Sequence, residues 1–205
     1  ITNLLKVLKE QSVWLQGRVI ICAYCGFKAL DNYGIYATQV MQMSQLESSE
    51  LTSIASYTRP LVAVIAGLIA DRWQASKSVK LFFILSGFGF LGMSLFEFGK
   101  QLQILIIANI VLTFIAVYAL RAVYFALVEQ AKIKLGVTGT AVGVISLVGY
   151  TPDIFFSSVT GRILDANPGF VGFQHYFLLL SMISIVGIIF VYLLDKSLNK
   201  AKLES

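Results

Sequence analysis

Charged side chains are scarce in this sequence of 205 residues. Asp, Glu, Lys and Arg together make up 13% of it, about half the roughly 25% that is usual in soluble domains. Hydrophobic residues make up 57%, and the mean hydropathy is +0.79. A water-soluble fold of this size could not bury that much apolar surface. The composition therefore excludes a soluble globular domain, a disordered chain and a nucleic-acid-binding domain.

Cysteine and histidine are nearly absent as well. The two cysteines, Cys22 and Cys25, lie one helical turn apart inside an apolar run, which is a poor setting for a disulfide scaffold, a redox pair or a metal. His175 is the only histidine, so no second imidazole is available for a metal cluster. We therefore expect no metal, no cofactor and no catalytic residue.

Long apolar runs dominate what remains. A helix that crosses a bilayer needs about 20 mainly apolar residues, and polar or helix-breaking segments separate six such runs. No loop between them is long enough to hold a soluble domain. The sequence predicts an all-α membrane protein with six transmembrane helices, at 13–42, 50–71, 79–98, 102–128, 139–163 and 171–194.

The expected organisation is one bundle with two short ends. Residues 13–195 form the six-helix bundle, 1–12 are a lead-in, and 196–205 are a tail. No basic segment with a cleavage site is present, so we expect no signal peptide. The chain starts with Ile1 rather than Met, as expected for a piece of a longer polypeptide or a mature form.

The distribution of Lys and Arg predicts the orientation. Six spans place both termini on one side of the membrane, and that side carries ten bases against two on the other. Short loops rich in Lys and Arg stay in the cytoplasm, so both termini are expected there, in the cell (inner) membrane. This bias also explains the pI near 9.2 without nucleic acid. The ten bases are Lys6, Lys9, Arg72, Lys77, Lys80, Lys132, Lys134, Lys196, Lys200 and Lys202; the two are Lys100 and Arg162.

An internal repeat relates spans one to three to spans four to six. Spans two and five each carry a proline in mid-helix, Pro60 and Pro152, and each ends in a Gly-x-x-x-Asp segment. Residues 81–96 of span three and 176–194 of span six carry no charge, whereas spans one and four each carry buried charge. Two inverted three-helix repeats are a common plan for transporter halves.

The segment that follows span two resembles a known family motif. Gly67-Leu68-Ile69-Ala70-Asp71-Arg72, followed by Lys77, looks like the loop motif of the major facilitator superfamily, in which a second Gly and a basic pair follow the Asp-Arg. Here Gln74 replaces that Gly, so we expect a looser turn. The resemblance implies the C-terminal half of a twelve-helix transporter, whose partner is a missing N-terminal six-helix half. It also implies that Gly67, Asp71, Arg72 and Lys77 form a conformational latch, in which Gly67 lets another helix pack closely.

Several charged residues fall inside the predicted spans. Intramembrane charge costs roughly 2.5–3.5 kcal/mol on insertion scales, so it normally faces a cavity or a partner. Span one carries a polar stripe along one face, which is typical of a helix that lines a water-filled path. The candidate substrate or ion pathway comprises Tyr24, Lys28, Asp31, Asn32, Arg59, Arg121 and Asp153.

Each of these charges has a structural alternative. Lys28 and Asp31, three residues apart, either neutralise each other for insertion or form a site where substrate or proton competes for the pair. Arg59 either contacts substrate beside the Pro60 kink or forms a packing ion pair with Asp153 or Asp31. Arg121 either binds an anion or reaches the cytoplasmic edge.

These features favour secondary active transport by alternating access. Deep cations outnumber deep anions by three to two, which favours a small organic anion as the substrate. Proton coupling through Asp31 or Asp153 is a further expectation. The alternatives are a six-helix channel or scaffold, and an intramembrane enzyme, for which no nucleophile and base are paired at depth.

Overall fold

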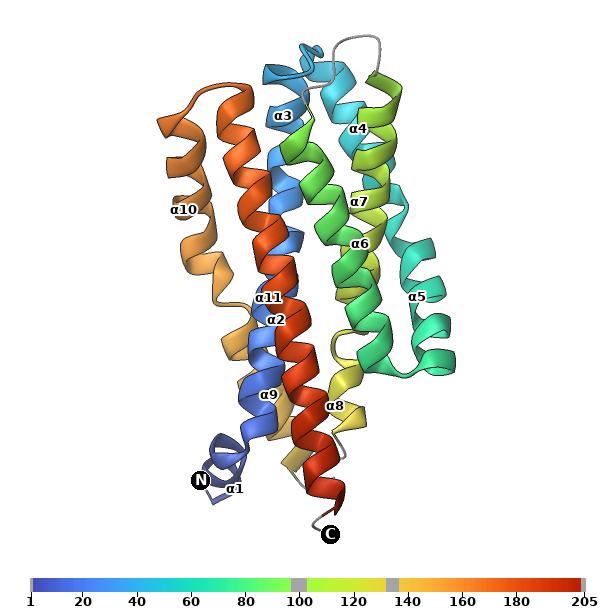
Figure 1. The fold of residues 1–205 in the computed structure, drawn as a ribbon, viewed down its shortest axis with the longest axis vertical. Coiled ribbons are helices and arrows are strands. Elements are labelled where there is room, and N and C mark those ends of the chain that lie inside the picture. The colour runs from blue at the N-terminus through green and yellow to red at the C-terminus, as the bar shows by residue number, and fades with distance from the viewer. Residues whose placement is uncertain (1, 97–102, 132–136, 204–205) are drawn as a thin grey trace.

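The structure is a computed structural model that describes residues 2–96, 103–131 and 137–203. Every regular element in these ranges is helical, as the sequence predicts. The helices run roughly along the long axis of the molecule, and both ends of the described chain lie at the same end of it (Figure 1). The elements are α1 (Thr2–Lys9), α2 (Gln11–Ala29), η1 (Leu30–Asn32), α3 (Tyr33–Gln39), α4 (Gln45–Tyr57), α5 (Arg59–Trp73), α6 (Ala75–Leu95), α7 (Gln103–Val123), α8 (Ala126–Gln130), α9 (Thr138–Gly149), α10 (Pro152–Ala166) and α11 (Phe170–Leu203).

Five helical segments among the described residues are long and apolar enough to cross a membrane: Gln45–Trp73, Ala75–Leu95, Gln103–Val123, Thr138–Ala166 and Phe170–Lys200. They match the predicted spans two to six. The predicted span 13–42 is not among them. It corresponds to α2, η1 and α3, whose polar stripe interrupts the apolar sequence. This segment is nevertheless at the centre of the bundle, where α2 packs against α7, α9, α10 and α11.

The end segments are more helical than expected. The lead-in 1–12 contains α1, and the tail 196–205 continues α11 as a helix as far as Leu203.

Four of the six segments are interrupted within their length. Proline lacks an amide N–H, and its ring clashes with the carbonyl four residues earlier in a helix. Accordingly α5, with Pro60 as its second residue, follows α4 after a break at Thr58, and α10 begins at Pro152 after α9 has ended at Gly149. The first segment is interrupted at η1 and the fourth between α7 and α8, whereas α6 and α11 are continuous.

Buried aromatic rings and one hydrogen-bonded hydroxyl hold the first interruption in place. Tyr33 and Tyr36 of α3 pack against Phe173 and Phe177 of α11 and are fully buried. The Tyr176 hydroxyl donates a hydrogen bond of 3.0 Å to the Ala29 carbonyl, at the point where α2 ends. A backbone carbonyl in an apolar bundle needs such a partner.

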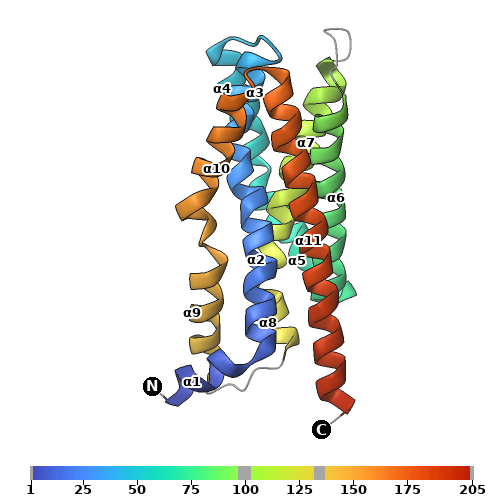
Figure 2. The ribbon, with the colours of Figure 1, turned by 60° about the vertical axis from the view of Figure 1, so that its left-hand side comes forward.

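The α6–α11 pair forms one side of the bundle, and α9 and α10 run along another side of α2 (Figure 2). Lys80 of α6 and Asp195 of α11 form an ion pair, and the Lys80 ammonium also lies 5.9 Å from the centre of the Tyr192 ring. This ion pair joins the two continuous helices at the end of the bundle where the chain ends.

The α5–α6 turn lies toward the same end of the bundle as α1 and the end of α11 (Figure 1). Arg72 and Lys77 therefore lie toward the end that carries both termini. Lys100, Lys132 and Lys134 lie outside the described residues.

We predict that a cysteine at Gln45 or Ala166, in a background without Cys22 and Cys25, reacts with an impermeant thiol reagent added to intact cells. A cysteine at Glu10 reacts only after permeabilisation. All three positions are exposed and lie near helix ends, and none of the changes removes a base. The reverse labelling pattern would contradict the orientation.

Candidate functional site

Lys28 stands between two carboxylates in the interior of the bundle. Its ammonium lies 2.8 Å from Asp31 Oδ2, three residues along the chain, and 3.9 Å from Asp153 Oδ1 on α10. The Lys28 side chain is 24% exposed, whereas those of Asp31 and Asp153 are 64% and 52% exposed. We call Lys28, Asp31 and Asp153 the Lys28 triad. Its lysine is mostly covered, whereas its two carboxylates are open to the surroundings.

A tyrosine network extends from this triad. The Tyr24 hydroxyl donates a hydrogen bond of 2.9 Å to Asp153 Oδ2. The Tyr24 ring contacts Tyr150, at the interruption between α9 and α10, and the Tyr150 hydroxyl lies 3.3 Å from that of Tyr124. Asp153 is thus held by Lys28 at one oxygen and by Tyr24 at the other.

Two arginines converge on the ring of Phe27. The Arg121 guanidinium carbon lies 3.6 Å from the centre of this ring, and that of Arg59 lies 5.8 Å from it. Arg59 also lies 5.9 Å from the centre of the Tyr118 ring. Such cation–π contacts stabilise a guanidinium without neutralising its charge.

Neither arginine has an acidic partner among the described residues. Their guanidinium groups form no ion pair there, and Arg121 Nη1 is buried without any hydrogen-bond partner. The packing ion pair of Arg59 with Asp153 or Asp31, one of the two alternatives, is therefore not present. Both carboxylates pair with Lys28 instead. A buried, unsatisfied guanidinium N–H is costly, and an anion would satisfy it.

A polar cavity of about 270 Å³ is partly lined by the rings that the two arginines contact. Phe27 and Tyr118, the rings beneath Arg59, form part of its wall. The remaining lining residues are Leu30, Asp31, Gly34, Thr52, Ser56 and Phe114. The Tyr118 hydroxyl donates a hydrogen bond of 3.3 Å to Ser56 Oγ.

The structure brings six of the seven predicted pathway residues together. Tyr24, Lys28 and Asp31 come from the first segment, and Arg59, Arg121 and Asp153 from α5, α7 and α10. Asn32 does not join them, because its amide donates a hydrogen bond of 3.0 Å to the Tyr176 hydroxyl of α11. We infer a structural role for Asn32 at the η1 interruption.

Among the rings that the arginines contact, the sequence predicted Tyr24 as a pathway residue but did not include Phe27 or Tyr118 in the pathway. Phe27 lies next to Lys28 in an apolar run, and nothing in the sequence marks it as the platform of two arginines. Tyr118 carries a signal, because it lies three residues before Arg121 and therefore on the same helix face.

The four predicted latch residues lie at the α5–α6 turn but do not contact one another as an ion-paired set. Within the described chain, Asp71 forms no ion pair with Arg72 or Lys77. A methyl group added at Gly67 would meet no atom within 4 Å. The close packing expected at Gly67 is therefore not made by any described helix. Asp71 instead lines a cavity of about 300 Å³ between this turn and α8.

The turn itself corrects one expectation. Only Gln74 separates α5 from α6, with φ 85° and ψ 135°, so the looser turn predicted from the missing glycine is wrong. The chain keeps a one-residue turn and accepts a backbone conformation that favours glycine. Gln130 of α8 supports it, because its side chain accepts a hydrogen bond of 3.0 Å from the Ser76 amide.

We predict that Gln74→Gly raises the stability of the protein by roughly 1 kcal/mol, because it removes the strain of a side chain at positive φ. The measurement is the thermal unfolding midpoint in detergent. Gln45→Gly, in the first turn of α4, is the control and lowers the midpoint. An unchanged or lower midpoint for Gln74→Gly would show that this turn is not strained.

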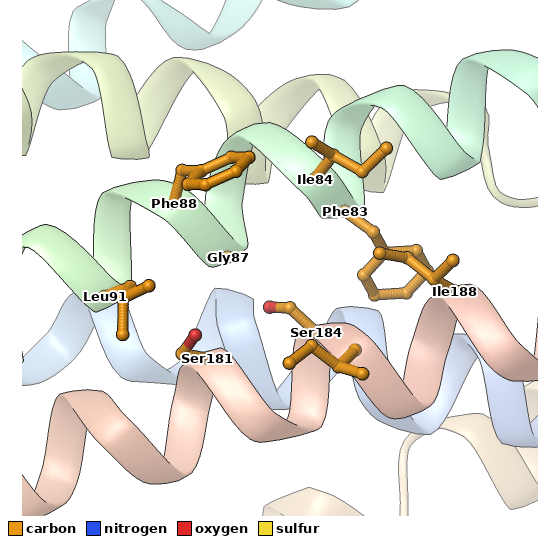
Figure 3. A pocket seen from close by; sticks show the side chains of 9 residues that line it. Phe83, Ile84, Gly87, Phe88, Leu91, Ser181, Ser184 and Ile188 are labelled. Atoms are coloured by element: carbon orange, nitrogen blue, oxygen red, sulfur yellow. The ribbon is translucent and has the colours of Figure 1, made fainter.

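An apolar groove of about 230 Å³ lies elsewhere, between α6 and α11 (Figure 3). Its lining is Phe83, Ile84, Gly87, Phe88, Leu91, Ser181, Ser184, Ile185 and Ile188. It contains no charged side chain, and Ser181 and Ser184 are its only polar lining residues. Elsewhere too, no three His, Cys, Asp or Glu side chains of the described residues are grouped as a metal site would require.

Comparison with known proteins finds similarity to two inner membrane proteins of one bacterium. No protein-family model matches it. It is 26% identical to the inner membrane protein YihN of Escherichia coli (strain K12) over 206 residues, which cover 99% of this chain and 49% of that protein. It is 24% identical to the inner membrane protein YqcE of the same organism, over 98% of this chain and 48% of that protein. The chain thus spans about half the length of the curated relatives it matches. With five apolar helices among its described residues that are long enough to cross a membrane, it is an all-α integral membrane protein.

Proposed function

We propose that this chain is the C-terminal six-helix half of a secondary active transporter of the major facilitator type, which carries a small organic anion by alternating access. The observation that carries the proposal is the charged site. Groups from α2, η1, α5, α7 and α10 meet in the interior of a membrane protein, and two arginines there lack an acidic partner. Intramembrane charges that are not neutralised pairwise are typical of substrate and ion pathways.

The order of interrupted and continuous helices supports two inverted three-helix repeats. Interrupted, interrupted and continuous segments follow one another twice along the chain. Spans Gln45–Trp73 and Thr138–Ala166, at matching positions, both have 29 residues, and 22% of the apolar window of each is buried. Discontinuous helices in paired positions mark the substrate site in many transporters.

The exposure of these two spans supports a missing partner half. Arg59 of α5 and Asp153 of α10 are both exposed. The charged site is therefore open at the surfaces of these two helices. A second six-helix half packed on α4–α5 and α9–α10 would close the site between the halves. The length of the relatives, about twice that of the chain, leaves room for such a half. We place the protein in the inner membrane, like these relatives, with both ends of this half in the cytoplasm.

The charge balance supports an anionic substrate. Lys28 neutralises one of its two carboxylates, which leaves one negative charge in the triad and two positive charges on the arginines. A bound anion would restore neutrality, which matters where the effective dielectric constant is low. Proton coupling fits the same arrangement. Asp153 or Asp31 can take up a proton while Lys28 stays paired with the other carboxylate.

The first test concerns the arginines. We predict that Arg59→Gln and Arg121→Gln each lower the uptake of organic anions by the full-length protein in proteoliposomes at least tenfold, because each removes a charge-assisted contact with the anion. The control is Arg18→Gln, since Arg18 lies on α2 over the Phe190 ring, away from the site. Wild-type uptake by both site variants, in correctly folded protein, would contradict the proposal.

The second test concerns the pair on the first segment. Lys28→Met alone removes the cationic partner of two carboxylates that are more than half exposed in this half of the protein, and it is expected to lower the unfolding temperature. The double change Lys28→Met with Asp31→Asn restores folding, because Asp153 keeps its hydrogen bond from Tyr24. We predict that the double variant unfolds near the wild-type temperature in detergent but does not transport.

If the double variant transports at the wild-type rate, the pair is only an insertion device. The substrate site would then be restricted to Arg59, Arg121 and Asp153.

A further inference from the structure

We infer that the solute carries several hydroxyl groups besides its anionic group, and that the cavity beside the arginines holds this hydroxylated part. The inference rests on the proposed anion transport and names the substrate class of the same site. It depends on which hydrogen-bond donors and acceptors in the cavity wall have no partner within the protein.

The polar atoms of the cavity are almost all acceptors. The Thr52 hydroxyl donates to the Ser48 and Ser49 carbonyls, at 3.0 and 3.2 Å, and the Ser56 hydroxyl donates to the Thr52 carbonyl at 2.7 Å. The Tyr118 hydroxyl donates to Ser56 Oγ. Each hydroxyl hydrogen is therefore used inside the protein, whereas lone pairs of these oxygens remain available.

Asp31 adds a fourth acceptor. Its Oδ2 holds Lys28 at 2.8 Å, and its other carboxylate oxygen has no partner among the described residues, although the residue lines the cavity. A wall of acceptors repels a carboxylate or a phosphate and favours a group that brings its own O–H or N–H donors. Since Lys28 offsets the charge of Asp31, neutral donors such as hydroxyls fit better than a second cation.

The donors of the site lie against the same rings that line the cavity. Arg59 lies over both Phe27 and Tyr118, and Arg121 over Phe27, and these two rings line the cavity. One ligand can therefore place an anionic group at the guanidinium groups and its hydroxyls in the cavity. The volume of about 270 Å³ equals that of about nine water molecules at about 30 Å³ each, which suits a short polyhydroxylated chain or one sugar ring.

The test compares binding of small probes to the full-length protein in detergent by titration calorimetry. Gluconate and glucose 6-phosphate are hydroxylated anions, hexanoate and inorganic phosphate are anions without carbon-bound hydroxyls, and glucose is uncharged. We expect gluconate or glucose 6-phosphate to bind at least tenfold tighter than the other three probes. The better of the two reveals whether the anionic group is a carboxylate or a phosphate.

Two nearly isosteric variants test the cavity itself. Thr52→Val and Ser56→Ala each remove one acceptor, and each is expected to weaken the hydroxylated anion about fivefold, the loss typical of one hydrogen bond. The affinity for hexanoate and phosphate stays unchanged. The matched controls are Thr38→Val and Ser49→Ala, which remove hydroxyls with the same intrahelical hydrogen bonds outside the cavity. They leave all affinities unchanged.

The outcomes separate this inference from the proposed function. If hexanoate or phosphate binds as tightly as the hydroxylated anions, or if the two cavity variants bind all probes like wild type, the hydroxylated substrate is wrong while the anion site stands. If none of the four anions binds, the anion site is overturned, and this inference with it.

Discussion

The arrangement of this protein depends on one constraint, the cost of placing charge inside a membrane bundle. Lys28 lowers that cost because it forms ion pairs with Asp31 and Asp153. The arrangement of the other charged groups depends on this pairing. Both carboxylates pair with Lys28, and neither forms an ion pair with the arginines in the described chain. Arg59 and Arg121 rest instead on aromatic rings, where a guanidinium keeps its charge and its donors.

The helix interruptions serve the same site. Lys28 lies at the end of α2 just before η1, Arg59 begins α5, and Asp153 stands in the first turn of α10. Each charged group is thus placed where a long segment changes from one helix to the next. The continuous helices α6 and α11 contribute none of these groups and pack against each other. Interrupted helices that carry the chemistry, supported by continuous ones, are consistent with a structure that changes access to a fixed site.

Local patterns in the sequence predicted local features well. The interruption at Pro60 follows from proline chemistry, and the Lys28–Asp31 pair follows from helical spacing. The contact between Lys28 and Asp153 could not be predicted in the same way, because it depends on how α2 and α10 pack across 125 residues of chain. At Gln74, by contrast, a local pattern gave a wrong prediction because tertiary packing determines the turn. Its residue type indicated a loose connection, but the packing of α8 against α6 holds it in a conformation that its own preference disfavours.

The most direct measurement of the central claim is an experimental structure of the full-length protein in a lipid nanodisc. The account predicts a second six-helix half packed on the α4–α5 and α9–α10 face, with Arg59, Arg121 and the Lys28 triad enclosed between the halves. A structure in which this face contacts lipid directly, with the charged site closed within the present six segments, would contradict it.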